Sequence, residues 1–171
     1  MGNALRRDDG FGLAAARRLV AEGVPEGVTV LEAGSAGVSV VHELMRGYDA
    51  LIIIDAATRG GVPGTLYEFD PVGAAEAGGA AEGAEVVGAP DSLHTVDPSH
   101  VLALARAAGC LPPRVAIVGC EPADCDELSD ELTPAVAAAV PRALALVRAR
   151  LRAWPRLSES TAGWHPSCSD R

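Results

Sequence analysis

Side chains that can bind a metal or transfer a proton occur at three places in this sequence of 171 residues. They are the acidic pair Asp8 and Asp9, then Asp55 directly after an apolar run, and His94 in a short polar loop. Two carboxylates and one imidazole give a mixed oxygen and nitrogen donor set, which suits nickel, zinc, manganese or ferrous iron and does not suit copper(I). Three protein ligands also leave coordination positions open for substrate groups or a reactive water.

Each of these residues alone has a simpler explanation. Asp9 has the type and position of a helix cap or of a first-turn charge that complements the helix dipole. Asp55 could equally bind a ribose, bind magnesium or form hydrogen bonds within a loop. His94 could be a surface histidine. Only the combination of the three indicates chemistry.

The elements that must position these residues follow from the hydrophobic pattern. Apolar periodicity predicts helices near residues 10–21, 38–46, 100–108 and 133–152, and strands near residues 28–31, 50–54, 65–69 and 114–118. Asp8 or Asp9 is expected to cap the first helix, and the strand of mixed polarity at 65–69 is expected at a sheet edge. Alternating strands and helices predict an α/β fold, a three-layer α/β/α sandwich with a mainly parallel sheet. In such folds, ligands bind beyond the carboxyl ends of the strands.

One expected element is missing. A ligand-bearing loop at the start of an α/β unit normally follows a strand, yet Met1, Gly2 and Asn3 lead directly into the loop. The continuous apolar run at 50–54 is typical of a strand buried inside a parallel sheet. The sequence therefore predicts either that the true start lies upstream of Met1 or that the protein does without its innermost strand.

Composition limits the rest of the chain. With 49% hydrophobic residues, residues 1–152 are expected to form one domain, interrupted by a Gly/Ala-rich surface insertion at 71–90 and followed by a loose tail at 153–171. The net charge of -9 disfavours nucleic acid as a partner. Apolar runs are too short to span a membrane, and no secretory signal is visible, so we expect a cytoplasmic protein. The cysteines (Cys110, Cys120, Cys125 and Cys168) lack C-x-x-C spacing and are expected to stay as thiols.

A family resemblance is visible in the segment GNALRRDDGFG at Gly2–Gly12. This segment closely resembles the G-N-x-L-x-x-D-[DE]-G-x-G signature of the hydrogenase maturation endopeptidases. Weaker resemblances follow in order along the chain: EAGSAG at 32–37, LIIIDA at 51–56, SLH at 92–94, GCEP at 119–122 and LTPAV at 132–136. The first segment is the most specific because it fixes seven identities within eleven positions.

The resemblance implies a fold and a function. It implies a phosphorylase/hydrolase-like α/β/α sandwich with Asp9, Asp55 and His94 as metal ligands and Asp8 as a supporting residue or cap. It implies a peptidase that recognises nickel in a hydrogenase large-subunit precursor and removes a short C-terminal extension. We expect a monomer. Because neither a G-x-S-x-G elbow nor an H-E-x-x-H helix is present, we expect a metal-bound water to cut the peptide bond with the help of Asp9 or Asp55.

Two other classes of function remain open at the level of sequence. One is a nucleotide-binding flavodoxin-like or Rossmann-like module, although the sequence has neither G-x-G-x-x-G after a strand nor G-x-x-x-x-G-K. The other is a non-catalytic assembly chaperone that recognises the nickel-loaded precursor without cutting it.

Overall fold

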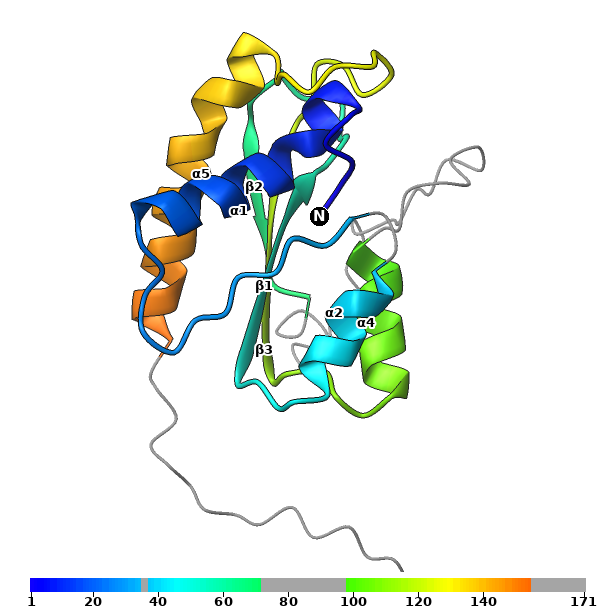
Figure 1. The fold of residues 1–171 in the computed structure, drawn as a ribbon, viewed down its shortest axis with the longest axis vertical. Coiled ribbons are helices and arrows are strands. Elements are labelled where there is room, and N and C mark those ends of the chain that lie inside the picture. The colour runs from blue at the N-terminus through cyan, green and yellow to red at the C-terminus, as the bar shows by residue number, and fades with distance from the viewer. Residues whose placement is uncertain (35–36, 72–97, 155–171) are drawn as a thin grey trace, which may run out of the picture.

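A computed structural model describes residues 1–34, 37–71 and 98–154, and Figure 1 shows the course of the chain. The short 3-10 helix η1 spans Arg7–Gly10. The α-helices are α1 (Phe11–Glu22), α2 (Val38–Leu44), α4 (Pro98–Ala107) and α5 (Pro134–Ala153). The strands are β1 (Ala50–Ala56), β2 (Leu66–Phe69) and β3 (Arg114–Cys120). The predicted insertion, apart from Pro71, and the tail beyond Trp154 lie outside the described residues.

The described strands form one small mixed sheet in the order β1-β3-β2. β1 and β3 are parallel, with Asp55 opposite Gly119, while β2 runs antiparallel to β3. The edge position predicted for residues 65–69 is therefore confirmed. Because β1 and β3 run in the same direction, the residues that follow them lie at the same edge of the sheet.

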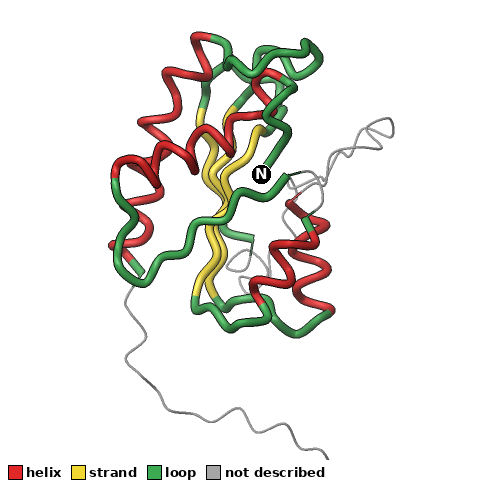
Figure 2. Tube along the Cα trace, in the orientation of Figure 1, coloured by secondary structure: helices red, strands yellow, loops and turns green. Residues whose placement is uncertain are grey.

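Helices cover both faces of this sheet, which confirms the predicted α/β class (Figure 2). On one face, α1 and α5 pack on Val118 and Cys120 of β3, with Phe11 fully buried among them. The opposite face is covered by α2 and α4. α5 continues through Pro141, as predicted. None of the helices in the described part of the chain is long and apolar enough to cross a membrane.

Two predictions about the strands are wrong. Residues 28–31 do not form a strand, and β1 lies at an edge of the described sheet instead of inside it. Both differences have one physical cause, because a strand exists only through hydrogen bonds to a neighbour. Among the described residues, no strand lies between β1 and the Val28–Leu31 segment to pair with either of them.

The prediction that Asp8 or Asp9 caps the first helix is also wrong. Gly10 is the N-cap residue of α1, and no side chain caps this helix. The two carboxylates accept hydrogen bonds from other segments, and the η1 turn places them there. Backbone groups outside α1 have therefore taken up the carboxylates that the sequence suggested as caps: distant loops bind Asp8, and Asn3 binds Asp9.

A substitution of Phe11 tests the packing of the core between α1, α5 and the sheet. We expect Phe11→Ala to lower the free energy of unfolding by about 3–5 kcal/mol, because it removes a fully buried ring. Leu128→Ala, at a side chain that is 82% exposed, is the control and should change it by less than about 0.5 kcal/mol. Urea unfolding followed by circular dichroism measures both, and equal effects would contradict this packing.

Candidate functional site

The first three residues pass between Asp9 and Asp55. The Met1 amine donates a hydrogen bond to the Ile54 carbonyl and lies 4.0 Å from Asp55 Oδ1. Gly2 has a φ of +118°, and a Cβ there would overlap the Asp9 carbonyl and lie 3.5 Å from Asp55 Oδ1. Only glycine fits this position, because a side chain would need both a positive φ and space that is already filled. Gly2 therefore allows the two acidic residues to approach one chain segment.

Asp55 and Asp9 have different surroundings. Asp55 is the next-to-last residue of β1 and is 4% exposed, and its Oδ1 accepts a hydrogen bond from the Ala56 N–H at 3.0 Å. Asp9 is partly exposed, and its Oδ2 accepts the Asn3 N–H at 2.9 Å. Burial lowers the pKa of the Met1 ammonium, although the charges of Asp55 and Asp9 act in the opposite direction. The structure thus brings two of the three predicted ligands to one edge of the sheet.

Asp8 is completely buried and holds two loops together. Its Oδ2 accepts the N–H groups of Ala123 (2.8 Å) and Asp124 (3.1 Å) and the Thr133 hydroxyl (2.9 Å). Its Oδ1 accepts the Thr133 N–H at 2.7 Å. Thr133 is the N-cap residue of α5, so Asp8 ties the loop before α1 to the start of α5. This saturated carboxylate has the geometry of a supporting residue, the role that the resemblance implied for Asp8.

Glu121 is a buried acid whose role the sequence analysis missed. It directly follows β3, and it is 3% exposed. Its carboxylate accepts the N–H groups of Arg59 (2.9 Å to Oε2) and Gly60 (3.1 Å to Oε1) and the Tyr67 hydroxyl (2.7 Å). The position at the carboxyl end of a buried strand was the available signal, because buried acids there need specific partners.

Glu121 shapes the loop that leaves the site. Besides the side-chain contacts, its backbone N–H donates to the Thr65 carbonyl and its carbonyl accepts the Gly64 N–H, both at 2.8 Å. Burial by itself raises the pKa of Glu121, but the hydrogen bonds from Tyr67 and from the backbone of the loop outweigh it, so that this pKa is lowered. The hydrogen bond to Glu121 in turn raises the pKa of Tyr67. The loop after Asp55 is therefore wrapped around a carboxylate that stays ionised at neutral pH.

The cysteines near these acids are not activated. Burial and the charges of Asp9 and Asp8 raise the pKa of the Cys125 thiol to about 12. Burial also raises the pKa of Cys120 to about 11, with Asp8 adding to the effect. A nucleophilic cysteine needs a lowered pKa, because the thiolate is the reactive form. Neither of these two thiols has such a lowered pKa.

The third predicted ligand, His94, lies outside the described residues. Within the described ranges, no group of three or more His, Cys, Asp or Glu side chains could hold a metal ion. The Asp9 and Asp55 carboxylates provide oxygen donors that fit a divalent cation such as nickel, but a ligand set of three needs a further side chain. The assignment of His94 stays a prediction.

Fold and site together define an α/β enzyme-like sandwich with acidic side chains at the carboxyl edge of a parallel strand pair. The sequence profile of the hydrogenase maturation protease family matches residues 14–150. The chain therefore belongs to the hydrogenase maturation protease family, and it is a peptidase.

Related proteins agree with this assignment. The hydrogenase expression/formation protein HupD of Rhodobacter capsulatus is 33% identical over 158 residues, which cover 90% of this chain and 70% of HupD. The hydrogenase maturating endopeptidase HybD of E. coli superposes with a TM-score of 0.67 at 27% identity, covering 88% of each chain. A hydrogenase 2 maturation peptidase from Thaumarchaeota archaeon SCGC_AB-539-E09 gives a TM-score of 0.62 at 29% identity, covering 88% of this chain and 93% of that one.

Substitutions of the neighbouring residues Asp8 and Asp9 can distinguish a residue that supports the fold from one that does not. We expect Asp8→Ala to lower the free energy of unfolding by at least about 3 kcal/mol, because it leaves several buried donors without an acceptor. Asp9→Ala removes one hydrogen bond of a partly exposed side chain and should cost about 1 kcal/mol or less. Urea unfolding compares them, and equal losses would contradict the division of roles.

The lowered pKa of Glu121 predicts that the stability of the protein depends on pH. Its folded pKa lies below the ordinary value of 4.5, so its ionised form stabilises the protein above that pH, and this contribution is lost as the pH falls through the folded pKa. We expect Glu121→Gln to cost about 1–3 kcal/mol at pH 7, and the gap from wild type to shrink below pH 4.5.

The control for Glu121 is Glu26→Gln, at an exposed position, which should change the free energy of unfolding by less than about 0.5 kcal/mol. Urea titrations at several pH values between 7 and 3 give the comparison. A gap between wild type and Glu121→Gln that stays constant over this range would show that the carboxylate charge is not what holds the loop.

Proposed function

We propose that this peptidase removes the C-terminal extension of a nickel-iron hydrogenase large-subunit precursor after nickel has been inserted. The observation that carries the proposal is the approach of Asp9 and Asp55 to the same Met1–Asn3 segment, at the carboxyl edge of the sheet in a maturation protease fold. Relatives of this chain bear the names of hydrogenase maturation endopeptidases and of hydrogenase formation proteins, which supports the substrate class.

In this proposal nickel is the recognition element and arrives with the precursor. Asp9, Asp55 and His94 would hold it, and the open positions would be filled by substrate groups. When bound, nickel can polarise a carbonyl group or a water molecule. A weak, shared site distinguishes loaded from empty precursor, because only the loaded form gains the additional ligands.

The residues of this chain then have separate tasks in the cleavage. Asp9 Oδ2 accepts one hydrogen bond from Asn3, and Asp9 is open enough to contact substrate. Asp55 is buried near the end of β1, and its Oδ1 accepts the Ala56 N–H. Either carboxylate can accept the proton of an attacking water, which is the role of a general base. The high pKa values of Cys120 and Cys125 favour this route over a thiolate nucleophile.

The test is incubation of the purified protein with nickel-loaded precursor and with nickel-free precursor. We expect cleavage of the loaded form alone, and a loss of at least about 100-fold in rate for Asp9→Asn, Asp55→Asn and His94→Ala. The matched control is His100→Ala, because His100 is an exposed histidine on α4 and should be dispensable.

Each other outcome has a definite meaning. Equal cleavage of both precursor forms would contradict nickel as the recognition element. Full activity of Asp9→Asn would contradict its assignment to the site. Tight binding of the loaded precursor without any cleavage would favour the assembly chaperone over the peptidase.

A further inference from the structure

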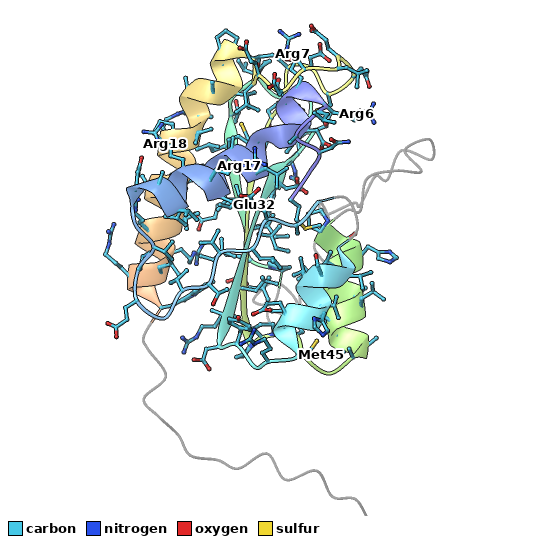
Figure 3. The ribbon with its side chains drawn as sticks, viewed as in Figure 1. Arg6, Arg7, Arg17, Arg18, Glu32 and Met45 are labelled. Carbon is cyan, nitrogen blue, oxygen red and sulfur yellow. The ribbon has the colours of Figure 1, made fainter. Side chains whose placement is uncertain are left out.

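Arg59, in the loop that follows β1, has an exposed side chain whose guanidinium forms no ion pair with the acids in the described part of the chain. Most of the other described arginines do form ion pairs with acidic side chains. Four of these are labelled in Figure 3: Arg6, Arg7, Arg17 and Arg18. In a protein of net charge -9, an exposed cation without an acidic partner is available to an anionic ligand.

Two aromatic rings hold the Arg59 guanidinium from one side. Its Cζ lies 4.2 Å from the centre of the Phe69 ring and 5.8 Å from the centre of the Tyr67 ring. The two rings stack on each other, with centres 6.3 Å apart and planes inclined by 27°. A guanidinium that lies over a ring leaves the N–H donors at its rim free to form hydrogen bonds. Arg59 therefore presents an oriented set of donors.

The backbone of Arg59 is held as well as its side chain. The buried Glu121 carboxylate accepts the Arg59 N–H at 2.9 Å and the Tyr67 hydroxyl at 2.7 Å, so one group fixes both the loop and the ring. Gly61 brings the loop close to this ring, because a Cβ there would overlap the Tyr67 hydroxyl. A side chain that is ordered before binding loses less entropy when a ligand arrives, so this arrangement is suited to recognition.

The aromatic pair lies on the same face of the sheet as Asp55. Gly119 of β3 is paired with Asp55 on one side and with Tyr67 on the other. Paired residues of neighbouring strands direct their side chains to the same face. The loop crosses β3 at this point, because a Cβ on Gly119 would lie 2.7 Å from the Ala57 Cβ. Two strand spacings place Tyr67 about 10 Å from Asp55, which is the length of about three extended residues.

We propose that Arg59 binds a carboxylate group of the C-terminal extension, about three residues from the bond that is cut. The planar fork of N–H donors matches the two oxygens of a carboxylate. Every extension offers at least its terminal carboxylate, and an acidic side chain would present the same oxygens. At this distance Arg59 contributes to affinity and not to the chemical step, so it acts on KM. The identity of the ligand rests on the proposed function.

Arg59→Met tests the proposal, because it keeps an apolar stem over the rings and removes the donors. Arg59→Lys keeps the charge without the fork, and Arg106→Met, at an exposed position on α4, is the control for the loss of one charge. For nickel-loaded precursor we expect Arg59→Met to raise KM about tenfold with unchanged kcat. Arg59→Lys should raise KM about threefold, and the control should leave it unchanged.

The source of the carboxylate is found with precursors whose extension is joined by peptide ligation. One form ends in a C-terminal amide, and the other has every Asp and Glu of the extension replaced by Asn and Gln. We expect one of the two forms to raise KM about tenfold with the wild-type protein and to have no further effect with Arg59→Met. The form that does so identifies the chain end or a side chain as the ligand.

The remaining outcomes are distinct. An unchanged KM in Arg59→Met, or a rise equal to that of Arg106→Met, would overturn the contact. A wild-type KM that neither neutralised precursor raises would overturn the carboxylate as its ligand. Fluorescence anisotropy of labelled nickel-free precursor measures affinity without cleavage. A tenfold loss of that affinity in Arg59→Met, together with no cleavage of loaded precursor by the wild-type protein, would support the contact and count against the proposed function.

Discussion

The hydrogen bonds accepted by the buried Asp8 carboxylate are the constraint on which the site depends. They join the loop before α1 to the loop after β3 and to Thr133 at the start of α5. A buried charge is tolerated only when its partners are complete, and this one has four donors. Because Asp8 is fixed, the η1 turn places its neighbour Asp9 on the opposite side, towards Asn3 and the end of β1. Of the two adjacent acids, Asp8 therefore supports the structure and Asp9 is accessible.

Glu121 follows the same principle in the loop after β1. It gathers backbone N–H groups of the loop that follows Asp55, together with the Tyr67 hydroxyl. Two buried carboxylates therefore hold loops that follow the strands: Asp8 holds the loop after β3, and Glu121 holds the loop after β1. In a protein of net charge -9, this concentration of acids disfavours anionic ligands and favours cationic ones.

Much of this arrangement could be predicted from the sequence, and the failures share a cause. The helices α1, α4 and α5 and the strands β1, β2 and β3 follow from local apolar patterns, and their predicted ranges differ from the observed ones by a few residues. The convergence of Asp9 and Asp55 follows from parallel strand direction and from the signature at Gly2–Gly12. The absence of a strand at 28–31, the absence of a side-chain cap on the first helix and the partners of Glu121 could not be predicted. Each depends on hydrogen-bond partners that no local apolar pattern encodes.

The central claim is that Asp9 and Asp55 act together on one cation while Asp8 maintains the loops. A double-mutant cycle of nickel affinity, with Asp9→Ala, Asp55→Ala and the double variant measured by calorimetry, tests it most directly. Shared coordination predicts that each single substitution removes most of the affinity and that the double variant loses little more. Losses that add to within about 0.5 kcal/mol would show that the two carboxylates act independently and would contradict a common site.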